Sequence, residues 1–444
     1  MQPVRFLHSA DLHLDSPFRG MRDVPENIRE RVRESTFGAL NKLVALAIRE
    51  QVDMVLISGD VYDLADRSLR AQLRLQKALQ ELSSRDIRVF IIHGNHDPLD
   101  GRAAKLSMPQ GCHVFGTEEV ETVLVERGDR GVVARVHGIS YSTSAVADNL
   151  AMRYKAVVPN TNPSQPVYEI GMLHTNVDGD ANHDNYAPCS KQDLQQSGMN
   201  YWALGHVHTR KMISGDTQID QDQTCIVYPG NTQGRSIREC GPRGCYIADV
   251  TADGRTRLTF HPLDEIRWHV EQISIAHMET EQELKDALEA HMQELLQAAD
   301  GRSCIVRFVL EGRGTLHDVL RKGSALQDLL TELRESDLAG GSQDSEAFIW
   351  PESIVDHTGR TIDLDQLLEE RSFVGDMLRM AREIGKDDQD LSDYRSEALS
   401  LLMTQPKIAR LLGVDAAEPD EIREWLQAAE ELLMDTLADG GWNG

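Results

Sequence analysis

The amino-acid sequence predicts an α/β fold with a cluster of polar side chains at one edge of a parallel sheet. Over roughly residues 1–265, short apolar runs alternate with amphipathic helical patterns, and this alternation is typical of parallel sheets. Five of the apolar runs lead into Asp, Asn or His side chains. Because ligands of open α/β sheets gather beyond the carboxyl ends of the strands, we expect these five polar groups to converge.

Apolar runs rich in β-branched and aromatic residues predict the strands of this sheet. They occupy residues 4–7, 53–57, 88–92, 168–173 and 201–204. Two helices are predicted because apolar side chains recur at three- and four-residue steps over residues 25–50 and 69–82. Further on, a second, mixed sheet is predicted from the runs at 114–115, 121–126 and 132–139, and a hairpin at 244–262 closes this part of the chain.

The pattern changes after about residue 265, which predicts further domains. A small α+β module is expected, with strands at 269–275 and 304–311 and helices at 279–298 and 316–334. From about residue 372 the chain is helical and acidic, and its amphipathic helices can pack on their own chain or dock a partner helix. The predicted domains are residues 1–265, 266–355 and 356–444.

The composition limits the classes of function. The net charge is −26, of which residues 1–270 contribute −4 and residues 271–444 contribute −22. A chain this acidic is not expected to bind nucleic acid on charge alone. No apolar run approaches the ~18 residues that cross a bilayer, and the start lacks the pattern of a signal peptide. Six scattered cysteines fit reduced thiols, so we expect a cytoplasmic protein without membrane contact.

The polar groups after the strands offer the ligands of a metal centre. They are Asp11, His13, Asp60, Asn95, His174, His206 and His208. Two divalent cations ~3.5–4 Å apart can clamp the attacking and leaving oxygens of a phosphoryl group. Imidazole, carboxylate and amide ligands without thiolate favour Mn²⁺, with Mg²⁺, Fe²⁺ and Zn²⁺ as alternatives. Residues i and i+2 of an extended strand point to the same side, so each Asp-x-His or His-x-His pair can converge on one site.

Five motifs, in this order and spacing, resemble the calcineurin-like metallophosphoesterase superfamily. They are Asp11-x-His13, Gly59-Asp60-x-x-Asp63, Gly94-Asn95-His96-Asp97, the lone His174 and Gly205-His206-x-His208. Within the superfamily, residues 10–18 and 230–235 resemble the SbcD-like bacterial DNA repair exonucleases, in the YhaO-type branch. The resemblance covers residues 1–265 and implies a four-layer αββα sandwich, followed by a capping domain. It also implies that the helical tail binds the coiled coil of an SMC-like ATPase.

Carried over residue by residue, the resemblance implies roles for individual side chains. One metal ion would be held by Asp11, His13, Asp60 and His208. The other would be held by Asp60, Asn95, His174 and His206, with Asp60 as the bridge. His96 would be the catalytic imidazole that protonates the leaving oxygen or steadies the transition state, and Asp97 would orient it by a hydrogen bond. A hydroxide on the metal ions would be the nucleophile.

Two further residues stand near the motifs. Asp63 occupies the position at which archaeal and eukaryotic relatives carry a histidine implicated in handling DNA, so the resemblance does not carry over a strand or end preference. Arg235 can contact a phosphate of the substrate as a bidentate donor, and a structural ion pair is an equal alternative.

The sequence therefore predicts a Mn²⁺-dependent DNA exonuclease of DNA repair, with some endonuclease activity. It would act with an SMC-like (SbcC-like) ATPase and form a homodimer. The alternative within the superfamily is a phosphatase or a small-nucleotide phosphodiesterase. Against a protein phosphatase, no Arg-Gly follows Asp63, and Asp97 stands where those enzymes carry Glu. The alternative from another class is a binding or scaffold module with a silent site, which a failure to bind Mn²⁺ would support.

Overall fold

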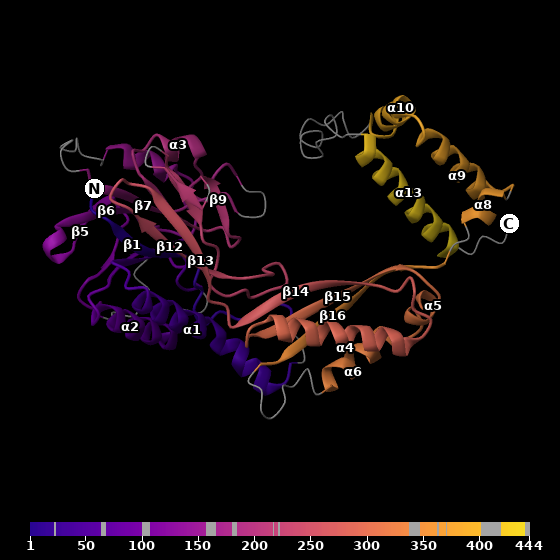
Figure 1. The fold of residues 1–444 in the computed structure, drawn as a ribbon, viewed down its shortest axis with the longest axis horizontal. Helices are drawn as coiled ribbons and strands as arrows, with labels where there is room; N and C mark the ends of the chain where they lie inside the picture. Colours follow the sequence, from indigo (N-terminus) through magenta and orange to yellow (C-terminus); the bar gives the residue numbers. More distant parts are fainter. Residues whose placement is uncertain are drawn as a thin grey trace. The chain divides into compact units, whose positions relative to one another are not determined.

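The structure is a computed structural model of the 444-residue chain. It describes residues 1–21, 24–63, 68–99, 107–156, 166–179, 184–215, 217–220, 223–336, 347–361, 364–369, 371–400 and 419–439. The chain divides into two compact units (Figure 1). The first comprises Met1–Glu271, Leu288–Phe308 and Leu330–Ile354, and the second comprises Gln272–Ala287, Val309–Leu329 and Val355–Gly444. The prediction of three domains stays a prediction.

The first unit contains two sheets that pack against each other, and the first of these has seven strands. Its order is β10 (Gln218–Ile219), β13 (Thr256–Pro262), β12 (Gly244–Val250), β1 (Val4–Ser9), β2 (Met54–Ser58), β3 (Arg88–Ile92) and β4 (Cys112–Val114). The strands β1 to β4 are parallel, whereas β12 pairs with β1 in the antiparallel direction. The predicted hairpin is confirmed as β12 and β13, which are antiparallel neighbours.

Two helices cover one face of this sheet, α1 (Glu26–Arg49) and α2 (Leu69–Ser83) (Figure 1). Their apolar stripes are buried in one core with side chains from β1, β2 and β3. The start of α2 is fixed by the hydroxyl of Ser68, which accepts a hydrogen bond from the backbone N–H of Ala71. The sheet is covered on both faces, which explains why β2 is apolar over nearly its whole length.

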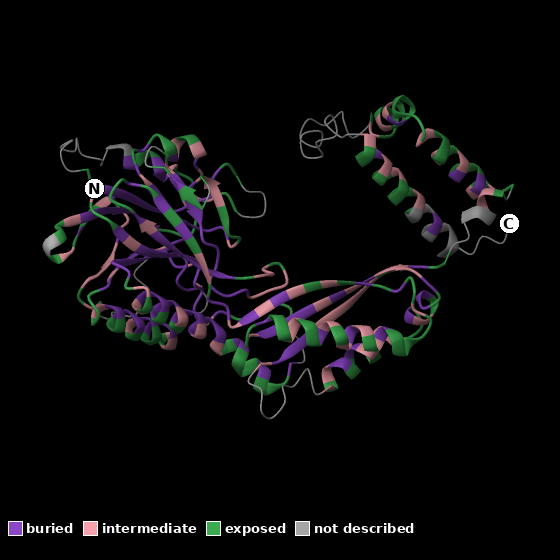
Figure 2. Cartoon of the chain, in the orientation of Figure 1, coloured by how far each residue is buried: buried purple, intermediate pink, exposed green. Residues whose placement is uncertain are grey.

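A six-stranded mixed sheet lies against the other face of the first sheet. Its order is β5 (Glu121–Glu126), β6 (Val132–Gly138), β7 (Tyr168–His174), β8 (Tyr201–Gly205), β11 (Cys225–Tyr228) and β9 (Lys211–Ser214). One hydrophobic core joins the sheets, with Phe6 and Phe90 on one side and Ile170 and Ala203 on the other. Figure 2 shows both sets of strands as largely buried.

A fourth layer covers the outer face of the second sheet. It contains α3 (Lys191–Gln195) and the short 3-10 helix η3 (Leu150–Ala156), which share a core with Trp202 of β8. Helices, sheet, sheet and helices therefore follow one another. This arrangement confirms the predicted α/β sandwich of four layers.

The region after residue 265 contains a three-stranded sheet and helices, as the predicted α+β module requires. The sheet has the order β14 (Ile266–Ser274), β15 (Ser303–Arg313) and β16 (Ile349–Gly359), and α4 (Glu281–Ala298) connects its first two strands. The single helix predicted at 316–334 was wrong. The structure has α5 (His317–Leu320) and α6 (Ala325–Glu335), because the chain takes a positive φ of 57° at Gly323 between them.

The C-terminal part of the small unit is helical, as predicted. Its helices are α8 (Leu364–Glu369), α9 (Phe373–Ile384), α10 (Asp388–Ala398) and α13 (Pro419–Asp439). Leu378, Leu391 and Ile422 are buried where α9, α10 and α13 contact one another. Among the described residues, no helix combines the length and apolar character that a membrane crossing requires.

Candidate metal centre

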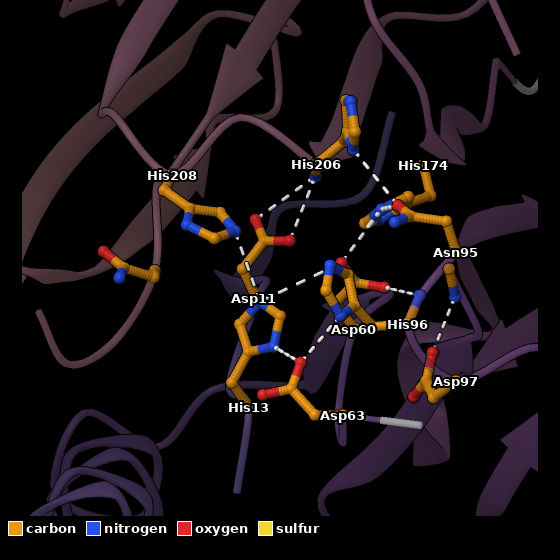
Figure 3. Close-up of polar contacts among 12 residues, drawn as sticks. Asp11, His13, Asp60, Asp63, Asn95, His96, Asp97, His174, His206 and His208 are labelled. Carbon is orange, nitrogen blue, oxygen red and sulfur yellow. Dashed lines mark hydrogen bonds and ion pairs between the residues drawn. The ribbon is translucent and has the colours of Figure 1, made fainter. Parts of the chain in front are cut away.

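The seven predicted ligands come together where the strands of the two sheets end (Figure 3). From the first sheet, Asp11 and His13 follow β1, Asp60 follows β2, and Asn95 follows β3. From the second sheet, His174 ends β7, and His206 and His208 follow β8. Six of the seven side chains are buried, and His208 is half-buried. The predicted convergence of the polar groups is therefore what the structure shows.

The backbone at four of these residues is held in an unusual conformation. Asp11, His13, Asp60 and His206 have positive φ angles of 52°, 43°, 49° and 101°. L-residues rarely adopt such angles, and strain of this kind clusters at functional sites. Hydrogen bonds hold these turns: the N–H of Asp11 donates to the Gly59 carbonyl at 3.1 Å, and the N–H of His206 donates to Oδ1 of Asp11 at 3.1 Å.

Two glycines let the backbone come close to the ligands. A Cβ atom on Gly94 would lie 2.7 Å from two ring atoms of His174 and would also collide with Oδ1 of Asp60. A Cβ atom on Gly205 would collide with the backbone carbonyl of Ser58. Only glycine therefore fits where β3 and β8 end, and this explains why the motifs that carry Asn95 and His206 begin with one.

Four donors form a first group that could hold a metal ion. The ligand atoms of Asp11, His13, Asp60 and His208 all lie within 4.8 Å of one another. The Nδ1 atoms of His13 and His208 donate to carboxylates, at 2.9 Å to Asp63 and 2.7 Å to Glu239. In the neutral rings the protons are thus on Nδ1, and two Nε2 lone pairs face each other at 3.2 Å. A cation between them would replace this repulsion by two bonds.

A second group of side chains also points acceptor atoms toward one position. His174 donates through Nδ1 to the Ser58 carbonyl at 3.0 Å, and His206 donates through Nε2 to the Asp184 carbonyl at 2.8 Å. A carbonyl only accepts, so the protonated nitrogen of each ring is fixed. The remaining nitrogens lie 3.0 Å and 3.2 Å from Oδ1 of Asn95. Three acceptor atoms therefore meet, which suits a second cation.

Asp60 lies between the two groups. Its Oδ2 is 3.9 Å from Nε2 of His13 and 3.4 Å from Nε2 of His174. Burial alone would raise the pKa of Asp60, but the neighbouring His174 and His13 outweigh burial and hold the pKa below its usual range. Burial likewise lowers the pKa of His174, yet the charge of Asp60 raises it to about 9. The buried carboxylate of Asp60 therefore requires positive charge beside it, and a metal ion on Nε2 of His174 would supply that charge in place of a proton.

Burial also acts on Asp11 and His13 of the first group by disfavouring their charged forms. It raises the pKa of Asp11 to about 6 and lowers the pKa of His13 to about 4. Both shifts measure how poorly the buried site solvates charge. A bound divalent cation would compensate the carboxylates directly, so the residues present fit a metal centre.

His96 lies beside these donors and has a different partner from the one predicted. Its Nδ1 is 2.7 Å from Oδ1 of Asp63, and its side chain is 41% exposed (Figure 3). This hydrogen bond raises the pKa of His96, against the opposing effect of burial. Burial would raise the pKa of Asp63, but hydrogen bonds from His13 and His96 hold it well below its usual range.

Asp97, the partner predicted from sequence, anchors the loop instead. It is fully buried and accepts hydrogen bonds from the N–H groups of Gly94 and Val61, both at 2.8 Å, and from Nδ1 of His93 at 2.9 Å. Because its oxygens are committed to these donors, Asp97 does not orient His96. The predicted partner of His96 is therefore corrected from Asp97 to Asp63, which follows Asp60 in the Gly-Asp-x-x-Asp motif.

Two neighbouring side chains complete the centre. Arg235 donates to Oδ2 of Asp63 at 3.1 Å, so the structural ion pair is present. Glu239 holds His208 and accepts from the N–H of Arg235 at 2.6 Å. Sequence reasoning missed Glu239, although it lies four residues after Arg235. The carbonyls of Ser58 and Asp184 carry no sequence signal, because every residue has one.

Two family models match the chain. The model described as calcineurin-like phosphoesterase matches residues 4–210, and the model described as the middle domain of the metallophosphoesterase YhaO matches residues 268–359. The first match contains all seven predicted ligands.

Curated relatives agree with these matches. The metallophosphoesterase YhaO of Bacillus subtilis is 33% identical over 98% of this chain and 98% of its own length. The SbcD component of the nuclease SbcCD of the same species is 29% identical over 32% of this chain and 35% of its length. The DNA double-strand break repair protein Mre11 of Saccharolobus solfataricus is 24% identical over 56% of this chain and 61% of its length. The chain therefore belongs to the calcineurin-like metallophosphoesterases, and within them to the YhaO type.

Proposed function

We propose that this phosphoesterase is a Mn²⁺-dependent DNA exonuclease of DNA repair, acting in the cytoplasm. The observation that carries the proposal is the pair of donor groups that share Asp60, with His96 beside them. Two distant relatives are named as part of a nuclease and as a DNA break repair protein, which supports nucleic acid as the substrate.

In this proposal one ion binds to Asp11, His13, Asp60 and His208, and the other to Asp60, Asn95, His174 and His206. Imidazole and carboxylate ligands without thiolate favour Mn²⁺ over softer or harder alternatives. When bound, such a pair of ions polarises the phosphoryl oxygens and lowers the pKa of the attacking water. The ring nitrogens fixed by Glu239, Asp63, Ser58 and Asp184 keep the ligands in the correct tautomer.

His96 supplies the proton in this proposal. Asp63 accepts from its Nδ1 and raises its pKa, which favours the charged form of the ring. Nε2 is the atom that donates to the leaving oxygen of the scissile phosphodiester. A charged donor beside the ligands is what the departure of an alkoxide requires.

The test uses the purified full-length protein with Mn²⁺, with Mg²⁺ and with a chelator. We compare nucleotide release from end-labelled duplex DNA with hydrolysis of a bis-aryl phosphodiester and of a phosphomonoester. We expect Mn²⁺-dependent DNA degradation that falls by about 10²-fold or more in His96→Ala. The same variant keeps its bound metal by elemental analysis, because His96 lies beside the ligands.

Other results would contradict the proposal. Hydrolysis of the phosphomonoester alone would assign the chain as a phosphatase, and hydrolysis of the small diester with intact DNA would favour a small-nucleotide substrate. Metal loss in His96→Ala would show that its role is misassigned. Failure of the wild-type protein to bind Mn²⁺ would support a scaffold with a silent site.

The proposal includes a partner at the helical tail. Phe373, Met380 and Leu432 are 60%, 65% and 69% exposed on α9 and α13. An apolar surface of this kind suits the helices of an SMC-like (SbcC-like) ATPase. A homodimer formed through residues 1–265 is part of the same proposal, as are the domain boundaries at 265 and 355.

A further inference from the structure

A large cavity opens beside His96 and His208 in the first unit. Its volume is about 1060 Å³, and basic side chains form much of its lining: Arg19, Lys211, Arg235 and Arg238. Small-molecule pockets usually occupy roughly 300–1,000 Å³, so the space exceeds what one nucleotide needs.

These basic residues come from three separate parts of the sequence. Arg19 lies in the segment after β1, Lys211 begins β9, and Arg235 and Arg238 lie between β11 and β12. The backbone N–H of Arg19 donates to the carbonyl of Arg235 at 2.9 Å, which joins the first part to the third. The sequence showed little basic clustering because the cluster exists only after folding.

The cluster is also fixed to the metal centre. Glu239 accepts from the backbone N–H of Arg235 at 2.6 Å and from Nδ1 of His208 at 2.7 Å. The segment that carries Arg235 and Arg238 therefore has a set distance from a proposed metal ligand. A phosphate bound by this segment would be held at a fixed distance from the bond that is cut.

The four charges are not equally neutralised. Arg235 pairs with Asp63 at 3.1 Å and approaches Glu239 at 3.9 Å. Arg19 and Arg238 are exposed, and neither has a carboxylate partner within the described part of the chain. Two guanidinium groups at one cavity without counter-charges attract an anion, and their planar donors match a phosphate.

We propose that this cavity binds the phosphates of a nucleic-acid strand that flank the scissile bond, with Arg19 and Arg238 as the contacting residues. The inference rests on the proposed nuclease function and deepens it, because it names the substrate as a strand with at least one phosphate beyond the bond that is cut. A dinucleotide reaches the metal centre but leaves this cavity unused.

The test is a series of thymidylate substrates with the full-length protein and Mn²⁺. The dinucleotide d(TpT) contains only the scissile phosphate, d(TpTpT) adds one flanking phosphate, and an oligomer of about ten nucleotides fills the cavity. We expect kcat/KM to rise about tenfold or more from d(TpT) to d(TpTpT), since hydrogen bonds to charged groups contribute on that order. The double variant Arg19→Ala/Arg238→Ala should lose most of this gain, chiefly through KM.

The matched control is Lys77→Ala/Arg257→Ala. Both residues are exposed in the same unit, neither lines the cavity, and the change in net charge is equal. This control variant should keep the rise in kcat/KM from d(TpT) to d(TpTpT). If both double variants lose the gain equally, net charge explains the effect and the inference is wrong. It is also wrong if the wild-type protein shows no gain.

A binding measurement separates this inference from the proposed function. In the His96→Ala background, which slows cleavage of the strand, we titrate a fluorescent oligothymidylate at several salt concentrations. Adding Arg19→Ala/Arg238→Ala should lower the magnitude of the slope of log affinity against log salt by about 1.4, because two phosphate contacts to a single strand are removed. An unchanged slope overturns the inference. If the wild-type protein cleaves no phosphodiester, the proposed function fails, and this titration still decides whether the cavity binds a strand.

Discussion

Asp63 and Asp97 are both carboxylates close to the loop that carries His96, and the structure gives them different partners. Asp63 bonds to the rings of His13 and His96 and to Arg235, whereas Asp97 bonds to backbone N–H groups and to His93. Asp63 is therefore placed to tune the imidazole that we propose to be catalytic, and Asp97 is placed to hold the loop. The same substitution, Asp to Asn, at each of the two positions should separate these roles.

For Asp63→Asn we expect kcat for a phosphodiester to fall about 10- to 100-fold at saturating Mn²⁺, as is usual when a partner of a functional imidazole loses its charge. The variant keeps the shape of the side chain but removes the charge that raises the pKa of His96. KM should change less than kcat. Steady-state kinetics on the bis-aryl phosphodiester measure both.

For Asp97→Asn we expect the free energy of unfolding to fall by about 1–3 kcal/mol, because a fully buried acceptor of several hydrogen bonds is altered. Denaturant unfolding of both variants makes the comparison. The opposite pattern, with catalysis lost in Asp97→Asn and kept in Asp63→Asn, would restore the assignment made from sequence.

At the scale of residues, the sequence predicted which residue types gather at the site and where they lie in the chain. It did not predict how their side chains are oriented. The convergence of the seven predicted ligands (Figure 3) could be expected because carboxylate, amide and imidazole groups follow successive strands. The partner of His96 was not found, because Asp63 and Asp97 each belong to a motif and spacing does not show which carboxylate the ring faces. Glu239 was missed because it lies outside the motifs and carries no spacing signal of its own.

At the scale of elements, the centre depends on how strands end. The loop after β3 starts at Gly94, where a Cβ atom would displace His174 and Asp60. We expect Gly94→Ala to weaken Mn²⁺ binding about tenfold or more, with overall secondary structure retained. Gly385→Ala is the control, because its Cβ would meet its nearest atom at 3.4 Å. Calorimetric titration with Mn²⁺ measures both, and equal affinities would contradict the role given to Gly94.

The elements themselves were predictable where apolar periodicity is strong. The helix α1 and the strands β2 and β3 are buried by many side chains, so their patterns are long and regular. The helix predicted at 316–334 failed because one glycine conformation divides it, and propensity alone does not reveal that break. The strand β16 was missed because it follows a polar stretch and carries Pro351, which weakens the strand pattern.

At the scale of the molecule, the chain separates its charges. The last 174 residues hold most of the net charge of −26, while the basic residues near the centre belong to the first unit. The total charge therefore argues against binding of nucleic acid, whereas the basic side chains around the site do not. We infer that the acidic tail serves a partner protein and that the first unit serves the substrate.

Deleting residues 372–444 tests this division. We expect the truncated protein to lose co-purification with an SMC-like ATPase, because α9, α10 and α13 are removed. Hydrolysis of a small phosphodiester should stay within about threefold, since every proposed ligand precedes residue 210. Co-purification that survives the deletion would show that the partner binds elsewhere.

The order of the strands in the first sheet has a consequence during synthesis of the protein. The strand β1 stands between β2 and β12, and β12 is made only when the ribosome has passed residue 250. Until then β1 lacks one of its neighbours, and the turn that carries Asp11 and His13 is supported from one side only. We therefore expect the turn that carries Asp11 and His13 to reach its final conformation only after β12 has been made.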